Sequence, residues 1–162
     1  MPREIGIGVW DLANRMPQTT FNLQQAELLL PRLEQLLRAA IEAKARLTEF
    51  GQELARQMER IVLIGGCQVN VSSIARTKRQ KDESVQRLQQ IVEEIENTGC
   101  LLKDLDIGLV DFPCRVAAQE VYLCWKLGEP HIHFWHNTDE GFARRKPIDE
   151  HMIGKIQRSC VH

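Results

Sequence analysis

The stretch Leu23-Gln-Gln-Ala-Glu-Leu-Leu-Leu-Pro-Arg-Leu-Glu-Gln-Leu-Leu-Arg-Ala-Ala40 begins the pattern that decides the fold. From Ala26 to Ile61, positions spaced alternately by four and three residues are apolar except at Lys44 and Gly51. The positions are 26, 30, 33, 37, 40, 44, 47, 51, 54, 58 and 61. A seam with a period of about 3.5 residues indicates a helix that packs lengthwise against another helix.

The start and the end of this first helix can be read from local signals. Asn22 followed by Gln25 resembles a capping box, with Phe21 and Ala26 as the flanking hydrophobic pair, so the helix should begin at Leu23. Gly65-Gly66 should end it, which gives a helix over about 23–63. Pro31 lies inside the pattern and lacks an amide hydrogen, so we expect a kink or a break into two helices near Leu30.

A second helix is expected over about 73–98, capped by Ser72 or Ser73 and stopped by Gly99. Its first half has few apolar seam positions, so that half should be exposed. At 1.5 Å per residue the two helices are roughly 58 and 37 Å long, so an antiparallel hairpin leaves about 20 Å of the first helix uncovered. The segment that follows must cover that end.

Three runs after the hairpin predict β-strands, over about 109–114, 120–127 and 131–136. Gly128-Glu-Pro130 joins the last two, which favours a small antiparallel β-meander packed on the helices and an α+β fold. The pairing of these two strands stays open by one residue. An odd loop pairs Cys124 with Phe134 and Tyr122 with His136, whereas an even loop brings Cys124 opposite His133.

The composition is that of one globular domain. The chain has 162 residues, of which 43% are hydrophobic and 27% charged. We therefore expect an N-terminal extension (1–20), a single α+β domain (21–148) and a C-terminal tail (149–162). The formal net charge of -1 argues against a surface dedicated to nucleic acid or to an anionic membrane.

Cysteine usage and hydropathy bear on the compartment. The five cysteines are odd in number and contain no Cys-x-x-Cys pair, which fits neither a disulfide framework nor a zinc ribbon. No apolar run approaches the ~20 residues that span a bilayer. A cytoplasmic protein without a membrane partner is expected.

The ordered succession of several short motifs resembles the bacterial family known as domain of unknown function 2203. The resemblance covers about residues 21–148, and its motifs are Phe21-Asn-Leu-Gln-Gln-Ala, Leu30-Pro-Arg-Leu, Gly65-Gly66, Gly99-Cys-Leu-Leu-Lys-Asp-Leu, Gly108-Leu-Val-Asp-Phe-Pro, Val121-Tyr-Leu-Cys-Trp, Gly128-Glu, Trp135-His, Asp139-Glu-Gly-Phe-Ala and Pro147-Ile. It implies a small protein of helices followed by a β-meander, and it implies no activity. Arg144 and Lys146 make this chain more basic than the family pattern at that point.

The first candidate site is a metal centre. His131 and His133 alternate on a predicted strand and would point to one side, and Cys124, Asp139 or Glu140 could complete the ligand set. A divalent metal is therefore possible, although no cofactor is required. The structural alternative is a pair of hairpin histidines that hydrogen-bond locally.

The second candidate is a polar pocket near the end of the third strand. A histidine beside carboxylates can act as a general acid or base, and a nearby arginine can hold an anion. The catalytic candidates are His136, Asp139, Glu140, Arg145 and Asp111, and the ligand-binding candidates are Trp125, Trp135 and Arg145. The structural alternative pairs Arg145 with Asp139 or Glu140 and leaves Cys124 as a buried core residue.

The leading functional hypothesis is a non-enzymatic binding or assembly module. Leu28, Leu29 and Leu30 in succession place apolar side chains on at least two sides of the first helix, so something besides the second helix must cover them. A homodimer formed through the helices is expected, with an unknown protein or small-molecule ligand. The alternatives are a small metal-dependent or acid-base hydrolase that uses the second candidate pocket, and a nucleic-acid contact through Arg76-Thr-Lys-Arg-Gln-Lys81, which the charge pattern disfavours.

Overall fold

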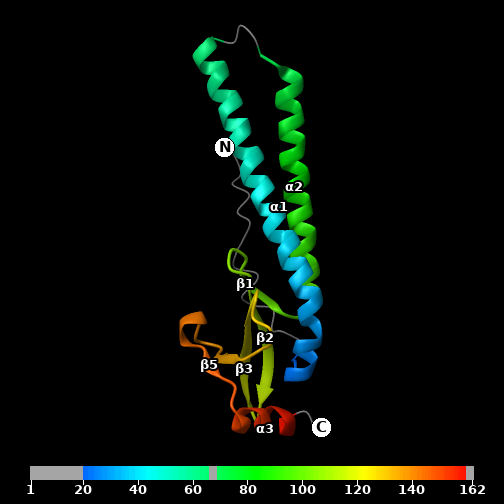
Figure 1. Cartoon of the computed structure of the whole chain (residues 1–162), viewed down its shortest axis with the longest axis vertical. Helices are drawn as coiled ribbons and strands as arrows, with labels where there is room; N and C mark the ends of the chain where they lie inside the picture. The colour runs from blue at the N-terminus through cyan, green and yellow to red at the C-terminus, as the bar shows by residue number, and fades with distance from the viewer. Residues whose placement is uncertain (1–19, 66–68, 160–162) are drawn as a thin grey trace, which may run out of the picture.

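The structure is a computed structural model that describes residues 20–65 and 69–159. The lower part of a long helical hairpin lies beside a small sheet, and a short helix lies at the far end of the sheet (Figure 1). The elements are α1 (Leu23–Ile64), α2 (Val71–Asn97), β1 (Leu101–Asp104), β2 (Leu109–Val116), β3 (Gln119–Lys126), β4 (Phe134–Asn137), the 3-10 turn η2 (Phe142–Arg144), β5 (Lys146–Pro147) and α3 (Glu150–Ser159). The α+β prediction is confirmed, and the expected extension over 1–20 lies almost entirely outside the described residues.

The first helix begins and ends as its sequence indicates. The Asn22 side chain accepts a hydrogen bond from the Gln25 amide, and the Gln25 side chain accepts one from the Asn22 amide, which completes the capping box. Gly65 closes the helix in the left-handed conformation. The structure has one helix across Pro31, so the expected break into two helices is absent. Pro31 is exposed, so the carbonyl that it leaves without an amide partner can be hydrated.

The second helix starts earlier than expected. Asn70, rather than Ser72 or Ser73, is the cap, and its side chain accepts a hydrogen bond from the Ser73 amide. Asparagine is among the strongest capping residues, which explains why the helix begins at Val71, before the serine pair. The two helices form the antiparallel hairpin, and their lower halves bury Leu33, Leu37, Ile91 and Ile95.

The sheet is an antiparallel meander in which each strand pairs with the next, in the order β1-β2-β3-β4-β5. The strands β2 and β3 lie where the sequence predicts them, but β4 begins only at Phe134, so His131 and His133 precede it. The strands β1 and β5 were not expected. Both are short, with four and two residues, and so carry little alternation that sequence reasoning could detect.

The pairing of β3 with β4 settles the open register. Cys124 lies opposite Phe134 and Tyr122 opposite His136, which is the odd-loop alternative. Residues that alternate along a strand occupy opposite faces of the sheet. The inner face, with Phe112, Leu123 and Trp125, packs against the apolar residues of the helices. The residues that alternate with these along each strand, such as Asp111 and Cys124, lie on the outer face.

Two contacts fasten the hairpin to the sheet. The Phe21 amide donates to the Pro113 carbonyl at 2.7 Å, and the Phe21 ring meets the Phe112 ring edge to face. Further along α1, Lys44 forms an ion pair with Asp106 in the turn between β1 and β2. The sheet therefore covers the lower half of α1, as the difference in helix length requires.

The segment expected as a C-terminal tail contains α3. Asp149 accepts a hydrogen bond from the Met152 amide at 2.7 Å, which caps the helix start. Met152 and Ile156 are buried in the apolar cluster, and the Ser159 hydroxyl accepts from the Ala117 amide at 2.8 Å. The helix thereby closes the end of the sheet that lies away from the hairpin (Figure 1).

A substitution at Gly108 tests the turn between β1 and β2. Gly108 has φ +65, and a Cβ atom there would lie 2.5 Å from Leu127 Cβ, so Gly108→Ala should lower the free energy of unfolding by about 2–4 kcal/mol. Gly51 is the control, because it sits in α1 with nothing within 4 Å of a built Cβ. Gly51→Ala should stabilise the protein by about 0.5–1 kcal/mol, since alanine is the better helix former. Urea unfolding measures both, and equal effects would contradict the turn geometry.

A second prediction concerns pH. Burial raises the pKa of the Cys100 thiol from 9.0 to about 11, so folding favours the neutral thiol. The stability it contributes is complete below pH 9 and is lost as the pH rises toward 11. The difference in unfolding free energy between wild type and Cys100→Ala should therefore shrink by about 2–3 kcal/mol between pH 8 and pH 11. A constant difference across that range, by chemical denaturation, would show that the thiol does not titrate this way.

Candidate functional site

Three side chains that can bind a metal or move a proton meet on the outer face of the sheet. Asp111 of β2 lies opposite Cys124 of β3, and His136 of β4 lies opposite the next outward-facing residue of β3, Tyr122. Asp111, Cys124 and His136 are all buried, with exposed fractions of 1%, 0% and 2%. We call these three residues the polar cluster.

The two ring nitrogens of His136 have different partners. Its Nδ1 lies 2.8 Å from the Asn137 carbonyl, which can only accept, so Nδ1 carries a hydrogen. Its Nε2 lies 3.1 Å from Asp111 Oδ2. A neutral imidazole would then have a lone pair at Nε2, and the carboxylate oxygen that faces it has no hydrogen to donate. A proton or a metal cation must therefore lie between these two atoms.

One oxygen of Asp111 is left unsatisfied in the polar cluster. Asp111 Oδ1 is buried and has no hydrogen-bond partner among the described residues. Burial and, to a lesser degree, the negative charge of Asp111 together raise the pKa of the Cys124 thiol to about 12, and the nearby Arg145 opposes this rise. A thiol with so high a pKa is not an activated nucleophile, which agrees with the expectation of a buried core cysteine.

Aromatic rings and one arginine lie next to the polar cluster. The Tyr122 ring packs edge to face on His136, with ring centres 5.6 Å apart. The Arg145 guanidinium lies between the rings of Phe134 and Phe142, at 4.3 and 4.2 Å from their centres. Arg145 also donates to Glu129 at 2.8 Å, so its charge is balanced.

The residues of the predicted acid-base pocket are only partly brought together. Asp111 and His136 are in contact, but Glu140 accepts from the Asn137 amide and from Lys146, both at 3.0 Å. Those donors lower the pKa of Glu140, and its carboxylate therefore stabilises the turn that follows β4. Asp139 is exposed. The expected pairing of Arg145 with Asp139 or Glu140 is wrong, because Arg145 pairs with Glu129.

The predicted ligand-binding tryptophans lie away from the polar cluster. Trp125 is on the inner face, where its Nε1 donates to the Glu129 carbonyl at 2.9 Å. Trp135, its neighbour on that face, lies beneath the Lys146 ammonium group at 4.8 Å. Trp125 therefore serves the packing of the sheet, whereas Trp135 lines a groove together with Val121 and Met152.

The predicted metal pair His131 and His133 is exposed and precedes β4. The two rings are 5.9 Å apart, and His131 Nδ1 lies 3.6 Å from Glu27. Cys124 does not join them, because the observed register brings it to Asp111 and His136 instead. The signal for this grouping was the alternation of faces along each strand, but it could be used only once the register was known.

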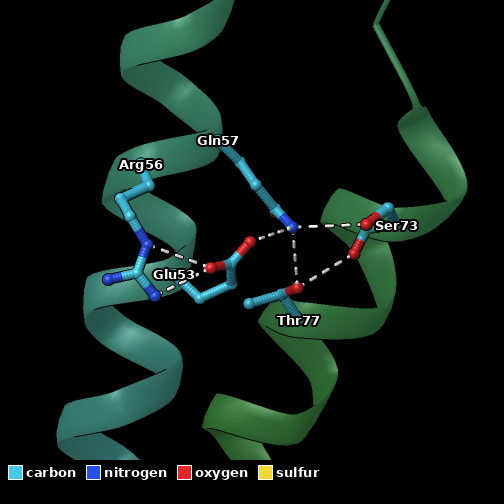
Figure 2. Close-up of polar contacts among 5 residues, drawn as sticks. All are labelled: Glu53, Arg56, Gln57, Ser73 and Thr77. Atoms are coloured by element: carbon cyan, nitrogen blue, oxygen red, sulfur yellow. Dashed lines mark hydrogen bonds and ion pairs between the residues drawn. The ribbon is translucent and has the colours of Figure 1, made fainter.

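The upper half of the hairpin is a second unusual region. We call residues 44–64 of α1 and 71–88 of α2 the hairpin arm. In it, only Thr77 and Ser84 are buried, and no apolar side chain is. The Gln57 amide nitrogen lies 3.2 Å from Ser73, from Thr77 and from Glu53, and so ties the helices together (Figure 2). The apolar seam residues Leu47, Leu54 and Ile61 are only half-buried there, so polar contacts contribute to holding the arm together.

The end of the hairpin arm also exposes large apolar side chains. Val62, Leu63 and Val71 are 80%, 76% and 70% exposed, and Ile64 is 54% exposed. At the opposite end of α1, Leu28 is 75% exposed. Exposed apolar groups gathered at one place mark a surface for interaction.

No helix in residues 20–65 and 69–159 is long and apolar enough to cross a membrane. Searches of curated proteins and of solved structures found no match. The model of one family, described as "Uncharacterized conserved protein (DUF2203)", matches residues 19–148, which are most of the chain. The match includes the hairpin, the polar cluster and the β-meander. The chain therefore belongs to the DUF2203 family of uncharacterised conserved proteins.

Proposed function

We propose that the protein is a non-enzymatic assembly module that works as a homodimer, with the two helical hairpins side by side and antiparallel. The observation that carries the proposal is the hairpin arm, which lacks a buried apolar core and exposes Val62, Leu63, Ile64 and Val71 at its end. A two-helix hairpin buries one stripe of each helix, and a second hairpin laid against it would bury the others. The thiols of Cys100 and Cys124 fit a reducing compartment such as the cytoplasm.

The positions of the exposed apolar residues support the antiparallel arrangement. Leu63 and Leu28 lie about 26 Å on either side of Arg46 along α1, at 1.5 Å per residue. Arg46 shares a groove between the helices with Ser84 and Arg87 of α2, so all three lie at about the same level. A two-fold axis at that level would place the apolar end of each hairpin against Leu28 of the other copy.

The charges of α2 support the same arrangement. The upper part of the helix carries Arg76, Lys78, Arg79 and Lys81, and the lower part carries Glu93, Glu94 and Glu96. Two copies of α2 that run antiparallel about a centre near Gln86 would bring the basic part of each beside the acidic part of the other. A parallel pair would place like charges together, which is unfavourable.

Removing an exposed apolar side chain from either end of α1 should weaken the dimer. Sedimentation equilibrium of the wild type should give twice the chain mass of 18.7 kDa, whereas Leu63→Ser and Leu28→Ser should each weaken dimerisation at least about tenfold. Phe142→Ser removes an exposed apolar side chain from a loop outside the hairpin and should leave the mass unchanged. A wild-type monomer at every concentration would refute the homodimer, and binding to a different protein would then remain as the use of this surface.

The antiparallel pairing has a separate test in charge reversal. Arg79→Glu should weaken the dimer by placing like charges together, and adding Glu93→Arg in the same chain should restore it, because the reversed pair is again complementary. Arg115→Glu changes an exposed charge on the sheet and is the control. Weakening by Arg79→Glu without restoration by the second change would exclude this arrangement even if a dimer exists.

A further inference from the structure

We infer that the polar cluster is a binding site for a divalent transition-metal ion of the zinc class, held by Asp111, Cys124 and His136. One atom from each residue would bind the ion: a carboxylate oxygen, the Sγ and the Nε2. These atoms all lie within 4.8 Å of one another. The site lies on the outer face of the sheet, away from the helices, and so does not depend on the proposed dimer.

The spacing of the ligand atoms fits a tetrahedral ion after a small movement of the thiol. Bonds of about 2.0 Å to nitrogen and oxygen and 2.3 Å to sulfur place the ligand atoms roughly 3.3–3.7 Å apart. The Nε2 of His136 and Oδ2 of Asp111 are already 3.1 Å apart. Three protein ligands leave a fourth position for water or another small ligand.

The orientation of His136 is the one that a metal ligand needs. Its Nδ1 donates to the Asn137 carbonyl at 2.8 Å, which fixes the ring and leaves the Nε2 lone pair directed at Asp111. Metal-binding histidines commonly donate their other ring nitrogen to a carbonyl or carboxylate in this way. The backbone of β4 thus holds the imidazole in the tautomer that binds an ion.

The unsatisfied oxygen of Asp111 points to the same occupant. Asp111 Oδ2 contacts His136, but Asp111 Oδ1 is buried and has no hydrogen-bond partner among the described residues, and burying a carboxylate oxygen without a partner is costly. An ion of charge +2 would balance the charges of the Asp111 carboxylate and a Cys124 thiolate, releasing the thiol proton on binding. Arg145 does not supply that balance alone, because Glu129 already pairs with it.

The ligand types select the class of ion. Thiolate and imidazole favour zinc and similar transition metals, whereas magnesium and calcium prefer sites made only of oxygen. The exposed pair His131 and His133 lacks both a thiol and burial, and so provides the natural comparison for any test.

The experiment is a titration of the full-length, untagged protein, stripped with a chelator and then dialysed, with Zn²⁺ and with Co²⁺. The wild type should bind about one equivalent of either ion, and bound Co²⁺ should show the intense near-ultraviolet absorption of a cobalt-thiolate bond. Cys124→Ser should abolish that absorption. His136→Gln and Asp111→Asn should each weaken binding more than about 100-fold. His133→Ala and Cys100→Ser are the matched controls and should bind as the wild type does.

Several results would overturn the site. Binding of less than about 0.1 equivalent by the folded wild type, or Co²⁺ binding without the thiolate absorption, would each exclude it. Binding that Cys124→Ser retains and His133→Ala loses would show an adventitious site on the exposed histidines. Circular dichroism checks that each variant folds, and if one does not, the wild-type cobalt spectrum decides alone. Sedimentation of the stripped protein separates this result from the oligomeric state.

Discussion

The structure depends on one continuous apolar contact between the lower hairpin and the inner face of the sheet. Leu33 and Leu37 of α1, Ile91 of α2 and Phe112 and Trp125 of the sheet belong to a single buried cluster. Neither part could be stable alone, because a two-helix hairpin and a small sheet each have one apolar side that must be covered. At one end of the contact Phe21 is hydrogen-bonded to β2, and at the other end Lys44 pairs with the β1–β2 turn.

This contact uses only one face of the sheet and only half of the hairpin, and the two remaining surfaces have different chemistry. The outer face of the sheet buries an aspartate, a cysteine and a histidine beneath aromatic rings. The upper hairpin arm buries the hydroxyl residues Thr77 and Ser84, has Gln57 hydrogen-bonded between its helices (Figure 2), and exposes apolar residues at its end. An ordinary structural domain would place apolar residues in both locations, so both deviate from what packing alone requires.

Local sequence signals located the helices and the central strands well. The Asn22–Gln25 capping box and Gly65 act within a few residues, so the ends of α1 follow directly from the sequence. The features that were missed depend on tertiary contacts. Pro31 leaves α1 unbroken, α3 is held through Met152 and Ile156 against the sheet, and the members of the polar cluster come from three strands.

The candidate site could not be derived from the sequence because a shift of one residue in the pairing of β3 and β4 changes every neighbour on the face. The alternation of faces along each strand could be read from the sequence, but the sequence also allowed Cys124 to face His133. Only the observed pairing of Tyr122 with His136 removes that alternative.

The polar interior of the hairpin arm has a consequence for the motion of the molecule. Amide groups exchange with solvent through local openings, whose free energy falls where little apolar surface is buried. The backbone around Gln57 and Thr77 rests on hydrogen bonds that water can replace, whereas that around Leu37 and Ile91 can open only by exposing the apolar cluster. The hairpin should therefore have a gradient of amide protection along its length, with a persistent lower part and an upper part that opens often while the rest of the protein stays folded.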